Sequence, residues 1–321
     1  MGFAAVVGGK EHEGPLGADF DLHDDTDRFG MDTWEKSESE MQRLALSLAL
    51  AKCSLASDTL DAIFAGDLLN QCTGSAYGLL SFKKPYFGLY GACSTFAEAT
   101  MLSSLMVNAG YFRKCAAVSS SHFCSAERQF RFPLEYGGQR APTAQWTATA
   151  SGAAVISAEG NGPYVTEVMP GIIVDKGVND ISNMGAAMAP AAIDTLTAYF
   201  TETGKQPTDF DLILTGDLGL EGLSITKTLM KNAGFDLAPV YNDCGLLLYG
   251  KASQDVHCGG SGCGCSASVI CGHILKRIAS GELKNVLYLA TGALMSPNSL
   301  KQGATIPGIA HLVHFSAEKN G

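Results

Sequence analysis

Short, almost continuous apolar runs alternate with longer segments in which apolar residues recur every three or four positions. The short runs are typical of strands buried on both faces, and the longer segments of helices. The strands predicted in the first half are Ala4–Val7, Asp61–Leu68, Lys114–Ser121 and Ala150–Ala158. An amphipathic helix is predicted from Trp34 to Lys52, opened by Asp32 and Glu35 in the arrangement of a capping box. Residues Phe123–Thr149 show no clear period, so we expect a long loop there.

The second half repeats this order of elements. Asp211–Leu218 matches Asp61–Leu68 at five of eight positions, 150 residues further along the chain. The other strands expected here are Tyr164–Val168, Ala238–Tyr241, Leu283–Thr291 and Ile309–Phe315, and the helices are Gly185–Thr203, Leu223–Ala233 and Gly262–Ser280. The pattern predicts a duplicated α/β chain, with two pseudo-symmetric βαβαβαββ halves at residues 1–160 and 161–321.

Two of the helices have too few polar residues to face water. Cys93–Asn108 is apolar on almost every side, and Gly262–Ser280 is rich in Gly, Ala, Ser and Cys. A helix that is apolar all round is buried, and small side chains let such helices pack closely. We therefore expect both helices between two sheets, in a layered αβαβα sandwich.

A cysteine stands at the start of the first of these helices. A strand signal at Phe87–Tyr90 leads through Gly91 to Cys93. The first N–H groups of a helix have no partner within the helix, and the helix dipole places partial positive charge there. Such a position favours a bound carboxylate, or a nucleophilic thiolate whose pKa falls from about 8.5 toward neutrality. The alternative is a buried structural cysteine.

Composition excludes several classes of protein. The 321 residues are 46% hydrophobic, enough for a large core, and their net charge of -10 lacks the basic footprint that nucleic acids require. No apolar run reaches about 18 residues and no signal peptide is evident, so we expect no membrane-spanning segment. The ten cysteines are expected to be reduced thiols.

Several longer motifs point to one family. They are Gly66–Gln71, Phe87–Thr95, Ser120–His122, Glu127–Pro133 with Glu135–Gln139, Leu214–Leu218 and Gly259–Cys263. In these blocks, and over most of its length, the chain resembles the stage V sporulation protein AD family, whose fold is similar to that of the thiolases and ketoacyl synthases. Members usually have an additional strand before the position of Val6–Gly8, so we expect the opening strand to be short or missing.

This resemblance implies binding rather than catalysis. It implies a non-catalytic thiolase-like module that binds dipicolinic acid, with or without calcium, in the machinery that moves this compound into the spore. The module would be peripheral at the forespore or spore inner membrane, held by integral membrane proteins of the same complex. By analogy with other thiolase-like proteins we expect a homodimer formed through a sheet edge, and no nucleic-acid partner.

The residues that catalysis requires in this fold are not all present. Condensing enzymes pair the helix-start cysteine with two histidines, or with a histidine and an asparagine, from the second half. The corresponding positions here are Thr215–Asp217 and Gly260–Cys263, so we expect no enzyme activity. The alternative is an acyl-transfer enzyme of the ketoacyl synthase type, with Cys93 as nucleophile and His122 as base. Of the other histidines, His257 fits a functional or a structural role equally well, and His273 is interpreted as a histidine of the core with its hydrogen bonds satisfied.

Recognition of dipicolinate, a planar pyridine with two carboxylates, would use the same region differently. The helix start at Cys93 and Ser94 would bind a carboxylate, as would the guanidinium groups of Arg128 and Arg131. The alternative for the two arginines is ion pairing with Glu127 or Glu135. The candidate ligand-binding residues are Asp67, Asn70, Cys93, Ser94, His122, Arg128, Arg131 and Asp217.

Ring contacts and metal ligands complete the prediction. Phe130, Phe132 or Tyr136 would contact the pyridine ring, and Asp67 and Asp217 would offer oxygen atoms to calcium. The cysteines at 258, 263 and 265 match no common zinc spacing, so we expect no resident metal and no cofactor.

Overall fold

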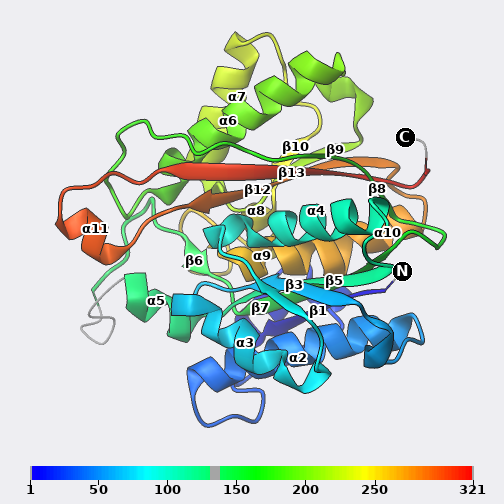
Figure 1. Cartoon of the computed structure of the whole chain (residues 1–321). Coiled ribbons are helices and arrows are strands. Elements are labelled where there is room, and N and C mark those ends of the chain that lie inside the picture. Colours follow the sequence, from blue (N-terminus) through cyan, green and yellow to red (C-terminus); the bar gives the residue numbers. More distant parts are fainter. Residues whose placement is uncertain (1, 131–137, 320–321) are drawn as a thin grey trace.

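Helices lie between two β-sheets and on the outer face of each sheet (Figure 1). The computed structural model describes residues 2–130 and 138–319. The first sheet has the order β2-β1-β7-β5-β3-β4, with β1 at Phe3–Gly8, β2 at Leu22–Asp24, β3 at Ala62–Gly66, β4 at Tyr86–Gly88, β5 at Lys114–Ser121 and β7 at Ala150–Ser157. The second has the order β10-β9-β12-β13-β8, with β8 at Tyr164–Met169, β9 at Leu212–Thr215, β10 at Tyr241–Asp243, β12 at Asn285–Ala293 and β13 at Gly308–Ser316.

The two sheets share one pattern of strand pairing. In the first, β3 is parallel to β5 and β5 is antiparallel to β7. In the second, β9 is parallel to β12 and β12 is antiparallel to β13. β3 and β9 are the strands whose sequences match, and the expected boundary at residue 160 falls between β7 and β8.

The apolar helices occupy the layer between the sheets. This layer holds α4 (Thr95–Asn108) and α9 (Cys263–Val269), and α9 continues through a π turn into α10 (Leu275–Ala279). The outer face of the first sheet carries α2 (Trp34–Lys52) and α3 (Thr73–Gly78), and that of the second carries α6 (Met184–Thr203) and α7 (Gly219–Asn232) (Figure 1). The layered αβαβα arrangement expected from the sequence is therefore confirmed.

Close backbone contact explains why the middle layer is built of small residues. A Cβ atom on Gly264 of α9 would lie 2.1 Å from the carbonyl oxygen of Ala150. A Cβ atom on Gly152 of β7 would lie 2.3 Å from the carbonyl oxygen of Ala267. Only glycine fits at either point, because these contacts are shorter than van der Waals distance.

The opening strand is neither short nor missing, so that expectation is wrong. β1 pairs antiparallel with β7 over Phe3–Val7 and parallel with β2, which places it inside the sheet. The three-residue strand β2, which the sequence pattern did not indicate, forms the edge instead.

Two local expectations also need correction. The cap of α2 is Thr33, whose hydroxyl accepts a hydrogen bond from the N–H of Lys36 at 3.4 Å, while Asp32 pairs with the Lys36 side chain at 2.8 Å.

The stretch expected to be a loop opens with a helix, α5 (Phe123–Phe130), and contains the short strand β6 (Trp146–Thr147), which pairs with β11 (Gly260–Ser261). α5 is too short for its period to be read from sequence.

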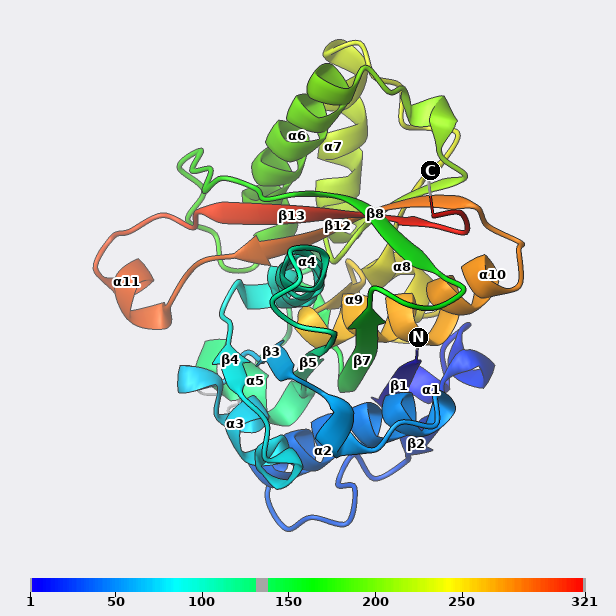
Figure 2. The same ribbon diagram turned by 45° about the vertical axis from the view of Figure 1, so that its right-hand side comes forward.

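The remaining helices are short: α1 (Gly9–His12), α8 (Cys244–Leu248) and α11 (Pro297–Lys301). α11 belongs to an excursion between β12 and β13 that extends away from the sheets (Figure 2). Within residues 2–130 and 138–319, no helix has the length and apolarity needed to cross a membrane.

Candidate functional site

Cys93 lies in a 3₁₀ turn, Ala92–Ser94, that leads directly into α4. Its side chain is buried and packs with Leu68, Ala126 and Cys263. Burial raises the pKa of the Cys93 thiol well above its usual range, and the nearby Asp217 carboxylate raises it further. Of the two possibilities for this cysteine, the structure agrees with the buried one, because the loss of water and the neighbouring acid outweigh the partial charge of the helix start.

Asp217 is held at the centre of a buried hydrogen-bond network. Its Oδ2 accepts from the Ser261 hydroxyl at 2.9 Å and from the Gly262 N–H at 3.0 Å, and its Oδ1 accepts from the Thr291 hydroxyl at 2.8 Å. The Ser261 Oγ lies 3.9 Å from the Cys93 Sγ. The structure thus brings Asp217 and Cys93, both predicted site residues, to one place where the ends of β9, β11 and β12 meet the start of α4.

Both ring nitrogens of His122 form hydrogen bonds with backbone groups. Its Nε2 lies 2.9 Å from the Asp27 carbonyl oxygen, and its Nδ1 lies 3.1 Å from the Cys124 N–H. The proton is therefore on Nε2, and the Nδ1 lone pair is already used. Burial lowers the pKa of His122 to about 4. In the described part of the chain His122 and Cys93 share no hydrogen bond, so the structure does not assemble a nucleophile and base from them.

Asp67 and Ser94 also have local partners. The Asp67 carboxylate accepts from the N–H groups of Leu69, at 2.9 Å, and Ser75, at 2.7 Å, and from the Ser75 hydroxyl at 2.6 Å. Ser94 is buried and donates its hydroxyl to the Gly91 carbonyl at 2.6 Å. Both side chains therefore hold their own turns in shape, rather than presenting free groups to a ligand.

A cavity of about 530 Å³ opens beside the buried cysteine. Four segments contribute to its walls: the loop after β3, the turn before α4, the end of α5 and the excursion that carries α11. The lining residues are Leu68, Asn70, Gln71, Tyr90, Arg128, Gln129, Met295, Ser296, Pro297, Asn298 and Lys301. Leu68 connects this cavity to Cys93, because it also packs against the thiol.

The cavity has a positive and polar lining. Among the lining residues that the structure describes, Arg128 and Lys301 are cations and none is a carboxylate. Burial raises the pKa of Tyr90 to about 12, and the neighbouring Cys93 adds to this effect. Tyr90 thus presents a neutral hydroxyl and an aromatic face. The arrangement suits a planar anion.

The predicted site residues divide accordingly. Asn70 and Arg128 line the cavity, whereas the other predicted site residues that the structure describes are buried and do not belong to its lining: Asp67, Cys93, Ser94, His122 and Asp217. Arg128 forms an ion pair with Glu35. Arg131, Phe132, Glu135 and Tyr136 lie outside the described residues, and Phe130 is the last residue of α5.

Sequence reasoning missed Tyr90 and Lys301. Tyr90 lies inside the Phe87–Thr95 motif, so its position between the strand signal and the helix was a usable signal. Lys301 had no such signal, because its place at the cavity depends on where the β12–β13 excursion folds.

The two other candidate histidines and two of the clustered cysteines each contact a partner outside the cavity. His273 lies 2.6 Å from Asp19 and His257 lies 3.0 Å from Asp255. Cys258 Sγ accepts from the Glu221 N–H at 3.4 Å, while Cys263 donates to the Ser120 carbonyl at 2.9 Å. In residues 2–130 and 138–319, no group of three or more His, Cys, Asp or Glu side chains is placed to hold a metal ion.

Two solved structures share this fold. The 3-oxoacyl-[acyl-carrier-protein] synthase III of Aquifex aeolicus VF5 superposes with a TM-score of 0.57 and 13% identity, covering 97% of this chain and 98% of that one. OleA H285N of Xanthomonas campestris superposes with a TM-score of 0.61 and 14% identity, covering 98% and 97%. At this level of identity the likeness concerns the fold alone.

Sequence comparison is more specific. The family model described as Stage V sporulation protein AD (SpoVAD) matches residues 1–316. The Stage V sporulation protein AD of Bacillus subtilis (strain 168) is 44% identical over 310 residues, which cover 97% of this chain and 91% of the relative. This chain, with its thiolase-like fold, therefore belongs to the stage V sporulation protein AD family of sporulation proteins.

Proposed function

We propose that the chain is a non-catalytic binding protein for dipicolinic acid, with or without calcium, in the spore dipicolinate uptake machinery. The observation that carries this proposal is the cavity beside Cys93, whose described lining combines Arg128, Lys301 and Tyr90 without a carboxylate. Dipicolinate carries two carboxylates on one flat ring, so it matches a lining with two cations and an aromatic side chain.

The chemistry of each group fits this ligand. Arg128 offers a planar fork that can bind one carboxylate in a bidentate manner, and Lys301 offers a compact charge to the other. The amides of Asn70 and Asn298 line the same cavity and can donate to carboxylate oxygens. Calcium would arrive as the chelate of the ligand, which brings carboxylate oxygens of its own.

Three features argue against acyl transfer as the function. Asp217 stands where condensing enzymes have a histidine, and both of its carboxyl oxygens already accept hydrogen bonds within the protein. The thiol of Cys93 has a raised pKa, so little of it is ionised at neutral pH. Both ring nitrogens of His122 are occupied. The cavity can therefore hold a ligand without attacking it.

The proposal includes a location and partners. We place the chain peripherally at the forespore or spore inner membrane, bound to integral membrane proteins of the same complex.

The proposal also includes a homodimer. β4 ends the first sheet, and it exposes Tyr86 by 38% and Phe87 by 42%. An uncharged edge strand with exposed aromatic groups is a surface for strand pairing, and a second copy supplies the same edge in antiparallel orientation.

The deciding experiment is calorimetric titration of the purified protein with dipicolinate, with and without calcium, alongside acetyl-CoA and malonyl-CoA. We expect saturable binding of dipicolinate, weakened about tenfold or more in Arg128→Gln and Lys301→Ala, since each removes a charge-assisted contact. Arg113→Gln and Lys231→Ala remove matched, exposed cations elsewhere and should leave binding unchanged. Absence of dipicolinate binding, or acylation of Cys93 by a CoA ester, would overturn the proposal.

A further inference from the structure

The Arg128 guanidinium that lines the cavity is already paired with a carboxylate. Its Nη2 contacts Oε1 of Glu35, which lies in the first turn of α2. Arg128 itself lies in the last turn of α5. The ion pair therefore joins the start of one helix to the end of another at the rim of the cavity.

Both partners are open to water. The Arg128 side chain is 42% exposed and that of Glu35 is 37% exposed. An exposed ion pair contributes little to stability, so a carboxylate from solution can replace Glu35 at little cost. Glu35 remains favourably placed after displacement, because the N-terminus of α2 attracts negative charge.

We propose that Glu35 acts as an intramolecular competitor of the ligand: it occupies Arg128 in the empty site and must be displaced when a carboxylate binds. This inference rests on the proposed function, because it concerns the same cavity. Glu35 thereby sets the affinity of the site without contacting the ligand. Its removal should strengthen binding, whereas loss of Arg128 weakens it.

The test is a double-mutant cycle on dipicolinate binding, measured by calorimetry. Glu35→Gln should tighten binding roughly two- to fivefold, the range that an exposed ion pair allows. In an Arg128→Gln background the same substitution should have no effect, because the competitor has lost its partner. Asp32→Asn is the matched control: it removes one negative charge from the same helix start, where Asp32 pairs with Lys36. It should leave affinity unchanged.

The outcomes separate this inference from the proposed function. If wild-type protein binds no dipicolinate, the proposed function fails. If wild-type protein binds but Glu35→Gln does not tighten binding, or tightens it equally without Arg128, the competitor inference alone fails. Thermal unfolding checks that each variant is folded, and Glu35→Asp, which shortens the same carboxylate, supplies a second variant with an expected intermediate affinity.

Discussion

The thiol of Cys93 and the hydroxyl of Ser261 meet across the two halves of the chain, with Sγ 3.9 Å from Oγ although 168 residues separate them. The Ser261 hydroxyl donates a hydrogen bond to Asp217, so serine, acid and thiol lie together. Burial and the neighbouring Asp217 both raise the pKa of the Cys93 thiol and oppose formation of a thiolate.

We expect Cys93 to resist alkylation in the folded protein. Native protein treated with iodoacetamide at pH 7.5 should show no modification of the Cys93 peptide by mass spectrometry, because the thiol is buried and its pKa is raised. After unfolding in urea the same peptide should be labelled fully. The Cys93→Ala variant, which cannot be labelled at this position, identifies the mass-spectrometric signal of the modified Cys93 peptide. Rapid labelling of Cys93 in the native state would instead indicate an activated nucleophile.

The contribution of Glu38 to the stability of the protein should decrease as the pH rises from mildly acidic to mildly alkaline. Burial raises the pKa of Glu38 from 4.5 to about 8, and the adjacent Asp67 adds to the shift. Between these two values the folded state holds a proton that the unfolded state has released, so the free energy of unfolding falls with pH.

Urea unfolding of wild-type protein and Glu38→Gln between pH 5 and 9 tests this dependence. The substitution should reduce the slope but not abolish it, because burial also raises the pKa of Glu11 and of Asp243 to about 7. Glu40→Gln, on the same helix but paired with Arg43, should keep the wild-type slope. An unchanged slope in Glu38→Gln would contradict the assignment.

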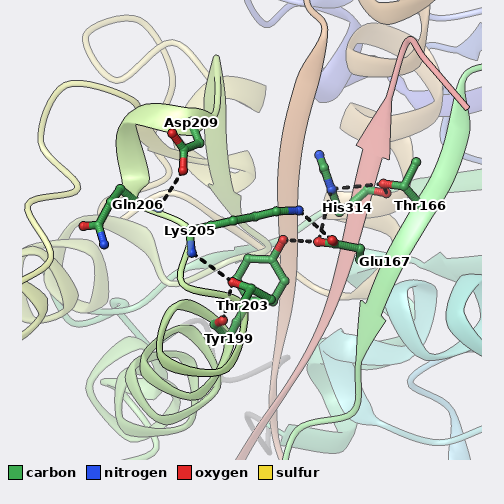
Figure 3. A network of polar contacts seen from close by, with 8 residues as sticks. All are labelled: Thr166, Glu167, Tyr199, Thr203, Lys205, Gln206, Asp209 and His314. Atoms are coloured by element: carbon green, nitrogen blue, oxygen red, sulfur yellow. Dashed lines mark hydrogen bonds and ion pairs between the residues drawn. The ribbon is translucent and has the colours of Figure 1, made fainter. Parts of the chain in front are cut away.

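A polar cluster joins the edge strand β8 to α6 (Figure 3). Glu167 accepts a hydrogen bond from the Tyr199 hydroxyl, pairs with Lys205 at 2.6 Å and lies 3.5 Å from the Nδ1 of His314. Tyr199→Phe should lower the free energy of unfolding by about 1 kcal/mol, because a partly buried hydrogen bond from a buried side chain is lost. Lys205→Met should cost less, about 0.5 kcal/mol, because the ion pair is partly exposed. The reverse order in urea unfolding would contradict this account.

Substitution at the edge of the first sheet should change the oligomeric state. If β4 pairs with its own copy, wild-type protein is a dimer by sedimentation equilibrium, and Tyr86→Lys is a monomer with an unchanged fold, because a charge on an edge strand blocks pairing. Tyr111→Lys alters a more exposed tyrosine outside the edge strand and should remain a dimer. A monomeric wild-type protein would refute the homodimer.

Local patterns were sufficient for much of the architecture. The match between Asp61–Leu68 and Asp211–Leu218 placed two acids at equivalent strand ends, and the uniform apolarity of Cys93–Asn108 placed that helix between the sheets. The spacing of apolar residues did not predict the short helices and strands. It missed α5 and the edge strand β2, each of which owes its place to packing against residues distant in sequence.

The family, the layered fold and the meeting of Cys93 with the second half could be predicted from the amino-acid sequence, because period, composition and motifs are properties of neighbouring residues. The chemistry of the site depends on how the chain folds. The tertiary structure buried Cys93 beside Asp217, turned both nitrogens of His122 to other partners and brought Lys301 to the cavity of Arg128. Ionisation and ligand contact depend on which atoms surround a group, and segments far apart in the chain supply those atoms.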